Sequence, residues 1–331
     1  MKATMLPLPQ ELYIEPTNRC NSRCETCVHT FREPEPPRDL TLAEFQTLVD
    51  QVPELHRVVL HGVGEPLLNR ELPAMISYLK QRPERPQVLF NSNAILLTPA
   101  WQEALLDADL DEYRISTDAA SPELYARIRG VDAFDRMVAN VAAFARRISG
   151  AGHGPKLSMW LTAIHENLGE LPGLVRLAHR VGVTEVYVHR MVYHGGGLAQ
   201  EEQAVFRALQ DTEEGLLAEA EKLAQQYGIL FRASGATTPR GSLLSSDGDP
   251  RPWSNCRRPT SLMYISANGN VLPCCLSPFT TRDYGNLILG NAFEASLETV
   301  WNGAAYRRFR AALQSDAPWE SCDRCGVRWS L

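Results

Sequence analysis

The sequence lacks the features that direct a protein to a membrane or to a nucleic acid. It contains no run of about 18 apolar residues, and its start, MKATMLPLPQELYIEP, lacks the basic, apolar and small-residue parts of a secretory signal. No run of five basic residues occurs, and the formal net charge is -6. These absences argue against a membrane protein and a nucleic-acid partner, and they predict a cytoplasmic location.

The sequence also lacks low-complexity tracts and any internal repeat other than a strand-helix alternation. Its 331 residues are 44% hydrophobic and 22% charged, which is typical of a folded protein with a sizeable core. This length is suited to one α/β barrel with a small additional domain. Because disulfides are rare in a reducing compartment, the eight cysteines indicate metal ligands or catalytic thiols.

Short β-branched segments alternate with amphipathic segments as far as about residue 191. We predict strands at 11–16, 57–62, 87–91, 112–117, 157–163 and 185–190. Repeated strand-helix units form a parallel sheet with right-handed crossovers. Six units predict an α/β fold in the form of a partial (β/α)6 TIM-like barrel. Its catalytic groups are expected at the carboxyl ends of the strands.

A segment rich in Gly, Ser, Pro and Asp follows the barrel and is interpreted as a linker. We place the barrel at 1–235, the linker at 236–252 and a smaller domain at 253–331. In the smaller domain Asn268 and Gly269 separate two alternating segments, which predicts a β-hairpin. A helix is expected over 296–313.

The cysteines form two groups along the chain. Cys20, Cys24 and Cys27 follow the first predicted strand, and five more lie at 256, 274, 275, 322 and 325. Cysteine thiolates hold iron-sulfur clusters, and three ligands leave one iron of a four-iron cluster open to a substrate or cofactor. The alternative is zinc, which prefers four ligands, and His29 could supply the fourth.

The pattern Cys20-x3-Cys24-x2-Cys27 after a first strand resembles the signature of the radical S-adenosylmethionine (SAM) superfamily. The resemblance implies that these three cysteines hold a [4Fe-4S] cluster whose fourth iron binds SAM. It implies reductive cleavage of SAM to a 5'-deoxyadenosyl radical, which abstracts a hydrogen atom from the substrate. A flavodoxin or ferredoxin is the reductant that the resemblance implies.

Segments after the next three strands agree with this resemblance. The residues that it places at SAM are Gly62, Gly64, Glu65, Asn93, Ser116 and Asp118, with Arg127 or Arg129 as the cation for the SAM carboxylate. Val63 is inserted relative to the Gly-Gly pair of the family. Thr26 stands where the family commonly has an aromatic residue near the adenine.

The C-terminal cysteines resemble those of the SPASM domain in its shortened form, called twitch. Cys256, Gly269 and Cys274 satisfy the family spacing, and a Cys-x2-Cys pair follows at 322 and 325. The resemblance implies one auxiliary [4Fe-4S] cluster closed by Cys256, Cys274, Cys322 and Cys325. Such a closed cluster is suited to electron transfer or substrate placement. A structural zinc ribbon is the alternative.

Cys275 has no role in either set of ligands. As the neighbour of Cys274 on a strand, it should point to the opposite face. It is either a small buried residue, a hydrogen-atom donor to a substrate radical, or a replacement for Cys274 as a ligand. Four side chains at the end of the sixth strand are candidates for substrate contacts or a general base: His189, Arg190, Tyr193 and His194.

The resemblance implies a radical SAM oxidoreductase or epimerase. We predict oxidation or epimerisation of a small natural product or short peptide, since no leader-binding module precedes the first strand. The auxiliary cluster would accept an electron in an oxidation, and Cys275 would donate hydrogen in an epimerisation. One alternative is a peptide-crosslinking enzyme. Another is a non-enzymatic iron-sulfur or zinc protein for redox sensing, although a structural cluster gains nothing from an open iron.

Overall fold

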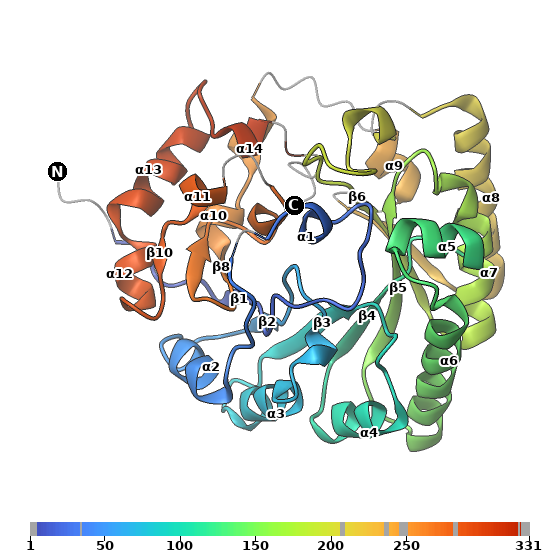
Figure 1. Cartoon of the computed structure of the whole chain (residues 1–331), viewed down its shortest axis with the longest axis horizontal. Coiled ribbons are helices and arrows are strands. Elements are labelled where there is room, and N and C mark those ends of the chain that lie inside the picture. Colours follow the sequence, from blue (N-terminus) through green and yellow to red (C-terminus); the bar gives the residue numbers. More distant parts are fainter. Residues whose placement is uncertain are drawn as a thin grey trace.

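A computed structural model describes residues 5–33, 35–205, 209–234, 238–244, 251–280, 284–323 and 325. In this part of the chain the strands form one ten-stranded sheet in the order β10-β9-β8-β1-β2-β3-β4-β5-β6-β7. Figure 1 shows the sheet curved into an open arc. The parallel strands of the arc are β1 (Glu11–Ile14), β2 (Arg57–Val59), β3 (Gln87–Ser92), β4 (Glu112–Ser116), β5 (Lys156–Ala163), β6 (Glu185–Arg190) and β7 (Leu230–Ala233).

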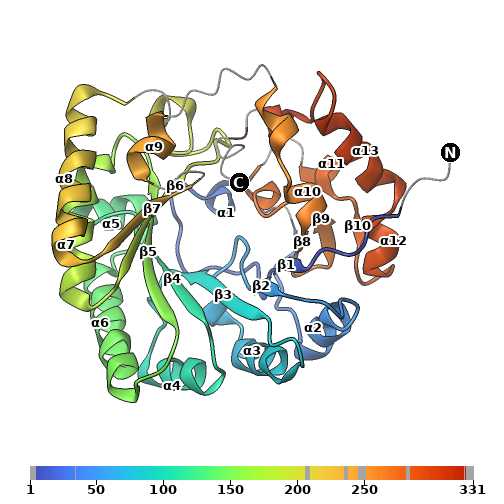
Figure 2. The ribbon, with the colours of Figure 1, turned by 180° about the vertical axis from the view of Figure 1, so that it is seen from behind.

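Helices lie along the outer side of the arc (Figures 1 and 2). They are α2 (Leu42–Val49), α3 (Leu72–Gln81), α4 (Pro99–Asp107), α6 (Phe134–Ala151), α7 (Leu171–Val181) and α8 (Asp211–Tyr227). Two further helices, α1 (Val28–Phe31) and α5 (Pro122–Arg129), lie near the carboxyl ends of the strands. The partial barrel predicted from the sequence is confirmed, and β7 adds a parallel strand to the six that were predicted.

The core lies between the sheet and the outer helices. Leu12 and Ile14 of β1 are fully buried there and belong to the same hydrophobic cluster as Phe45 of α2. Because side chains alternate along a strand, Glu11 and Tyr13 point to the inner side, where both are half-buried. The same alternation assigns each strand residue to the helix-covered face or to the inside of the arc.

The C-terminal elements continue the same sheet. The predicted hairpin is present as β8 (Leu262–Ile265) and β9 (Asn270–Leu272), which pair antiparallel, and β10 (Gly290–Asn291) follows. Strand β8 also pairs in parallel with β1, so the C-terminal unit joins the free edge of the barrel. Its helices are α10 (Arg258–Ser261), α11 (Tyr284–Leu287), α12 (Leu297–Trp301), α13 (Ala304–Leu313) and α14 (Glu320–Asp323).

The helix expected over 296–313 is divided into α12 and α13. Gly303 is the N-cap of α13 in an extended conformation, which ends the helical path. Asn302 exchanges two hydrogen bonds with the backbone of Leu6, from Leu6 N at 2.9 Å and to Leu6 O at 3.0 Å. The break therefore places a side-chain amide where it can hold the chain that leads to β1.

Part of the segment expected as a linker is folded. Helix α9 (Pro239–Leu244) lies within 236–252, and both Ser242 and Leu243 are fully buried. Arg190 at the end of β6 donates from Nε to Ser242 Oγ at 3.1 Å. The small and polar residues of this segment therefore contribute to packing on β6, while residues 245–250 lie outside the described residues.

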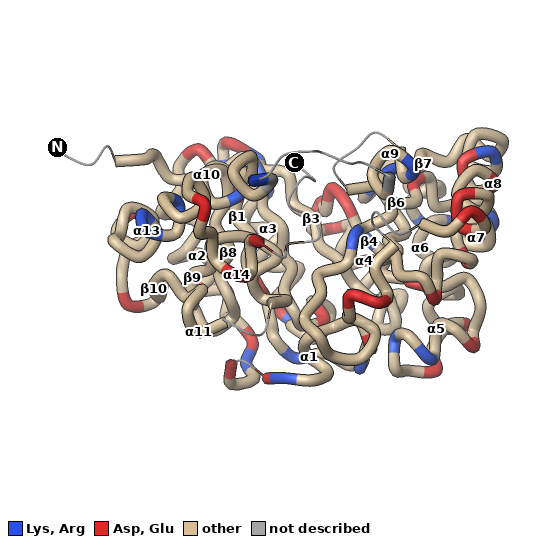
Figure 3. Tube along the Cα trace, turned by 90° about the horizontal axis from the view of Figure 1, so that it is seen from above, with Lys and Arg blue, Asp and Glu red and all other residues tan. Residues whose placement is uncertain are grey.

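Charges of both signs are mixed along the chain (Figure 3). Among the helices in the described ranges, none combines the length and the apolar character needed to cross a membrane.

Candidate functional site

The first group of cysteines lies in the loop that connects β1 to α1. Cys27 is the residue directly before α1, and its N–H donates to Cys24 O at 3.1 Å. Thr30 Oγ of α1 also donates to Cys24 O, at 2.8 Å. This tight turn brings the thiols of Cys20, Cys24 and Cys27 close enough to interact electrostatically.

Burial raises the pKa of Cys20 to about 11 and that of Cys27 to about 12, and the pKa of Cys24 is raised for the same reason. Neighbouring thiols oppose ionisation further. Only the thiolate binds iron. The three thiols therefore carry protons in the metal-free protein and release them when a cluster binds.

The zinc alternative gains no support from His29. Its Nε2 lies 2.8 Å from Asn18 O, so this ring nitrogen is engaged by a backbone carbonyl. Within the described residues, no group of three or more His, Cys, Asp or Glu side chains is arranged to hold a single metal ion.

The glycine segment after β2 packs directly on the chain that leads to Cys20. A Cβ atom added at Gly64 would lie 2.1 Å from Thr17 O, and one at Gly62 would lie 2.1 Å from Glu15 Oε1. Glu65 N donates to Arg19 O at 2.8 Å. Only glycine allows this approach, so the segment cradles the cysteine loop.

Glu65 and Asn93 connect the ends of β2 and β3 to the cysteine loop. Glu65 is 3% exposed and accepts hydrogen bonds from Ser92 Oγ at 2.6 Å and Asn93 N at 2.8 Å. Asn93 Nδ2 donates to Asn21 Oδ1 at 2.7 Å and Ser22 Oγ at 3.0 Å. These two residues, predicted at SAM, therefore also order the loop that carries the thiols.

Asp118 joins the end of β4 to its neighbours. It has φ +60°, which is unusual for a residue with a side chain. Its Oδ1 accepts from Thr162 N and its Oδ2 from Arg129 Nη1, both at 2.7 Å. Ser116, at the end of β4, is half-buried and makes no side-chain hydrogen bond within the described residues. Its hydroxyl is therefore available, whereas Asp118 is fully used by the protein.

The two candidate arginines have different surroundings. The side chain of Arg129 is 12% exposed, pairs with Asp118 and lies close enough to Cys24 to interact electrostatically. The side chain of Arg127 is 67% exposed and pairs with Glu166 at 2.5 Å. Of the two cations, Arg129 faces the cysteine loop and Arg127 faces the exterior.

Gly130 also supports the loop, and the sequence analysis missed it. It ends α5 with φ +63°, and a Cβ atom added there would lie 2.1 Å from Arg23 O. Two residues earlier, Ile128 O accepts a hydrogen bond from Glu25 N at 2.8 Å. A glycine directly after an amphipathic helix is a signal for a helix C-cap, but its contact with the cysteine loop is tertiary.

The second group of thiols comes from three separate segments. Cys256 follows a short 3-10 helix (Pro252–Asn255), Cys274 follows β9, Cys322 lies in α14, and Cys325 comes after α14. Burial raises the pKa of Cys322, and the thiols of Cys274, Cys325 and Cys256 add to this shift. The four predicted ligands therefore lie close enough to interact electrostatically.

The donor sets fit the cofactors that the sequence implies. The first offers three thiols in one loop beside a glycine cradle and a buried arginine, and the second offers four thiols. Iron-sulfur clusters are held by such thiolates, and each cysteine involved is half-buried or buried.

Aromatic and basic side chains line the inner side of β4, β5 and β6. Trp160 stacks on Tyr187 with 3.9 Å between ring centroids, and the guanidinium of Arg114 lies 4.4 Å from the Trp160 ring. Arg114 also donates to both carboxylate oxygens of Glu112, at 3.0 and 3.2 Å. The inner wall therefore presents flat, half-buried rings beside a neutralised cation.

Two histidines on this inner side are held neutral. Burial, aided by Arg114, lowers the pKa of His61 to about 4. Burial, aided by Arg258 and His61, lowers the pKa of His189 to about 3. His61 stacks on Phe279 of the C-terminal unit at 5.8 Å, and its buried Nδ1 has no hydrogen-bond partner within the described residues. The sequence analysis did not select His61.

The other candidates at the end of β6 do not line the inner wall. Arg190 is 2% exposed and binds Ser242, and His194 is 8% exposed with its ring 5.8 Å from that of Phe31. Tyr193 packs against a small hydrophobic cluster around Ile128. Of the four side chains selected there, His189 is the one on the inner wall.

Cys275 lies between the two halves of the protein. It is half-buried and interacts with Tyr13 on the inner side of β1 and with Arg258 of α10. Burial raises its pKa to about 12, so it is a protonated thiol. It therefore lies next to Tyr13, while its neighbour Cys274 belongs to the thiol group. The expectation that both cysteines lie on a strand is wrong, because β9 ends at Leu272 and both follow it in a turn.

A cavity of about 230 Å³ opens beside Cys20 at the junction of the two halves. Its walls include Arg23 and Val63 from the barrel, and Tyr264 and Tyr284 from the C-terminal unit.

Two family models match this chain. Residues 14–178 match the model described as the radical SAM superfamily, and residues 256–326 match SPASM, described as an iron-sulfur cluster-binding domain. Together they contain all seven cysteines predicted as ligands.

Known proteins resemble the chain along nearly its whole length. A PqqA peptide cyclase of Granulibacter bethesdensis is 24% identical over 97% of this chain and 81% of its own. An AdoMet-dependent heme synthase of Methanosarcina barkeri is 23% identical over 98% of this chain and 89% of its own.

Solved structures share the fold. Streptococcus suis SuiB bound to precursor peptide SuiA has a TM-score of 0.70 at 17% identity, covering 98% of this chain and 71% of SuiB. Native anSMEcpe with bound AdoMet has a TM-score of 0.66 at 14% identity, covering 98% of this chain and 88% of that chain.

Proposed function

This chain belongs to the radical SAM superfamily and carries a SPASM domain, and from this premise we propose that it cross-links side chains within a peptide substrate. The enzyme uses SAM and [4Fe-4S] clusters, as membership of this superfamily and its SPASM domain require. Cross-linking was the alternative in the sequence analysis, and the relatives favour it over oxidation or epimerisation of a small molecule.

One observation carries this proposal: the relatives that match over both cysteine regions include several PqqA peptide cyclases. Two further findings support a peptide substrate. SuiB has been solved with its precursor peptide SuiA, and anSMEcpe with AdoMet and the Kp18Cys peptide. Both share the fold of this chain.

In the proposed enzyme each group of cysteines has one task. Cys20, Cys24 and Cys27 hold the SAM-binding cluster, and four thiols at 256, 274, 322 and 325 hold one auxiliary cluster. When bound, these cofactors supply the 5'-deoxyadenosyl radical and an acceptor for one electron. A flavodoxin or ferredoxin is the proposed reductant.

The SAM site is built from the residues around the first loop. The glycine segment at 62–64 packs closely on the chain that leads to Cys20, and the half-buried Ser116 hydroxyl faces the inside of the barrel. Arg129 supplies a fixed positive charge beside Cys24. Glu65 accepts a hydrogen bond from Asn93 N, and Asn93 Nδ2 donates to Asn21 Oδ1, so these two residues hold the cysteine loop in place.

The inner wall is the proposed site of the reacting side chains. Joining two C–H carbons removes two hydrogen atoms from the peptide. With SAM bound, the 5'-deoxyadenosyl radical would take one hydrogen atom, and the second would leave as a proton and one electron. That proton passes to solvent. The imidazoles of His61 and His189 have pKa values lowered by burial to about 4 and about 3, so they are weak bases and add uncharged polar groups to this wall. The four C-terminal thiols would hold the cluster that serves as acceptor for the electron.

The test is anaerobic incubation of the holoenzyme with dithionite, SAM and short peptides encoded beside its gene, followed by mass spectrometry. We expect 5'-deoxyadenosine together with a peptide lighter by two hydrogen atoms and linked between two residues. A peptide whose mass is unchanged in H2O, but which gains one deuterium when the reaction is run in D2O, would identify an epimerase and overturn the proposal. Absence of 5'-deoxyadenosine with every substrate would favour the redox-sensing alternative.

A further inference from the structure

The turn between β8 and β9 is held by two buried carboxylates from the N-terminal part of the chain. Glu15, directly after β1, accepts hydrogen bonds from Val63 N at 2.7 Å and Ala267 N at 3.1 Å. Glu35 reaches the same turn from the segment that follows the cysteine loop. The C-terminal unit is thus attached to the barrel by strand pairing and also by these side chains.

Glu35 makes the denser set of contacts. It is 9% exposed, and its oxygens accept from Ser266 Oγ at 2.7 Å, Asn268 Nδ2 at 2.9 Å and Asn270 Nδ2 at 2.8 Å. Tyr284 OH is a fourth donor. Among the residues that the structure describes, no ion pair involves Glu35, and its contacts in this set are with neutral donors. We call Glu35 and these four donors the Glu35 clamp.

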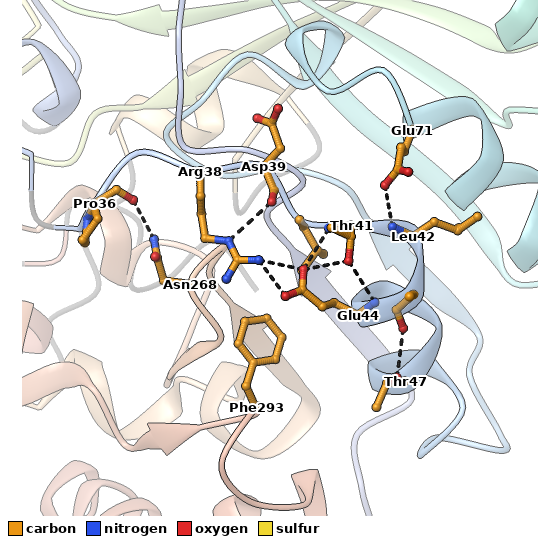
Figure 4. Close-up of polar contacts among 12 residues, drawn as sticks. Pro36, Arg38, Asp39, Thr41, Leu42, Glu44, Thr47, Glu71, Asn268 and Phe293 are labelled. Carbon is orange, nitrogen blue, oxygen red and sulfur yellow. Dashed lines mark hydrogen bonds and ion pairs between the residues drawn. The ribbon is translucent and has the colours of Figure 1, made fainter.

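The segment after Glu35 is fixed on both sides (Figure 4). Asn268 Nδ2 also donates to Pro36 O at 3.0 Å, and the guanidinium of Arg38 lies 5.4 Å from the Phe293 ring centroid. Arg38 binds both carboxylate oxygens of Glu44 at 2.7 Å, which connects the segment to α2. The backbone around Glu35 therefore has little freedom to follow the turn if the clamp opens.

The position of the clamp in the chain connects the two thiol groups. Glu35 lies eight residues after Cys27, and Asn270 lies four residues before Cys274. Strand β9 carries Asn270 and ends just before Cys274. The cavity beside Cys20 is lined by Glu35 and Tyr284. A shift of the turn would thus move the C-terminal thiols relative to the first loop.

We propose that Glu35 is a positioning residue that fixes the spacing between the Cys20–Cys27 loop and the C-terminal thiols. This inference rests on the proposed cluster ligands and does not depend on the substrate. A carboxylate accepts all four hydrogen bonds of the clamp. The amide of a glutamine accepts on one atom only, and its NH2 group would face donors, so Glu35→Gln should open the clamp with almost no change in volume.

The experiment compares the reconstituted holoenzyme with Glu35→Gln and with Glu33→Gln. Glu33 lines the same cavity, is exposed and makes no hydrogen bond or ion pair within the described residues, so it controls for the loss of charge. Electron paramagnetic resonance of the reduced protein measures the spin-spin interaction between the two clusters. Amide hydrogen exchange over 266–270 measures opening of the turn without relying on the clusters.

We expect Glu35→Gln to retain its iron, to exchange these amides at least about 10-fold faster and to show an altered spin-spin interaction. Glu33→Gln should match the unmodified enzyme in all three. Unchanged exchange and spin-spin interaction in Glu35→Gln would overturn the inference. Faster exchange with an unchanged spin-spin interaction would also overturn it, because the clamp would then only stabilise the fold.

A second variant, Tyr284→Phe, removes one donor and leaves the carboxylate, so it tests the clamp if Glu35→Gln does not fold. It should change exchange and spin-spin interaction in the same direction by smaller amounts, and no change in either would count against the clamp.

These readouts are separate from the proposed reaction. If the unmodified enzyme makes 5'-deoxyadenosine but no cross-linked peptide, the proposed function fails while the clamp can still be measured.

Discussion

The two thiol groups of this protein are assembled in opposite ways. Cys20, Cys24 and Cys27 come from one loop of eight consecutive residues, while the C-terminal four are spread over 256–325. The first group is ordered by strand-end side chains and by the end of α5. The second depends on a hairpin and two short helices. The difference shows that cysteine sulfur ligands can be provided by one local motif, as in the first group, or by the tertiary arrangement of distant segments, as in the second.

The largest expected effect comes from removing one ligand of each group. Cys24→Ala should abolish formation of 5'-deoxyadenosine, because the open cluster loses one of its three ligands. Cys322→Ala should retain that activity and lose the cross-linked product. Each variant should lose about four of about eight irons per chain. Iron analysis and product assays check this, and loss of all iron in Cys322→Ala would show that the groups are not independent.

The next effect concerns the positive charge beside the first group. Arg129→Gln leaves Asp118 buried without its ion-pair partner and removes the cation near Cys24, so kcat/KM for SAM should fall about 10- to 100-fold. Arg127→Gln is the matched control and should stay within about twofold, because this side chain is exposed. Steady-state formation of 5'-deoxyadenosine measures both, and equal losses would contradict the assignment.

A smaller effect is expected at the junction of the two regions. Burial raises the pKa of Glu15 from 4.5 to about 7, so the folded protein keeps a proton that the unfolded chain releases in this range. Stability should therefore fall as pH rises from about 4.5 to about 7, by about 1–3 kcal/mol. Thermal unfolding across this range measures the fall. Glu15→Gln should remove this dependence of stability on pH, and Glu33→Gln should leave it unchanged. If stability still falls with pH in Glu15→Gln, another titrating group causes the fall.

The smallest effect separates backbone strain from contact with the cysteine loop. Gly130 and Gly228 both end helices with positive φ, +63° and +66°, but a Cβ atom meets Arg23 O only at Gly130. Gly228→Ala should cost about 1 kcal/mol for the strained φ alone. Gly130→Ala should cost about 1 kcal/mol more, because the loop must move. Thermal unfolding compares the two variants. Equal decreases in melting temperature would show that Gly130 does not support the cysteine loop.

Much of the barrel follows from the sequence because its signals are local. The six predicted strands match β1 to β6 to within a few residues, because each is a short apolar segment bounded by turn residues. The hairpin was also predicted, because Asn268 and Gly269 favour a tight turn. The missed β7 is short, and of its four residues, LFRA, only Ala233 is buried, so no clear alternation marks them.

The site could be predicted from the sequence only where its residues lie within one motif. The cysteine spacing identifies the first loop, but it gives no choice between Arg127 and Arg129, which differ by half a helical turn in direction. His61 and Arg114 gain their surroundings from other strands and from Phe279, so no sequence window identifies them. The same holds for Glu35, whose partner Ser266 lies 231 residues away.

The parallel pairing of β8 with β1 also has a consequence for the order in which the protein is made. Strand β1 emerges from the ribosome first, and its outer edge waits for residues 262–265 before it gains a neighbour. Until then the edge offers unpaired N–H and C=O groups to any other strand, which is an aggregation hazard for a growing chain. The cysteine loop beside it stays uncovered for the same interval. Translation thus leaves a period in which iron and sulfide can reach the first three thiols before the final quarter of the chain closes the sheet.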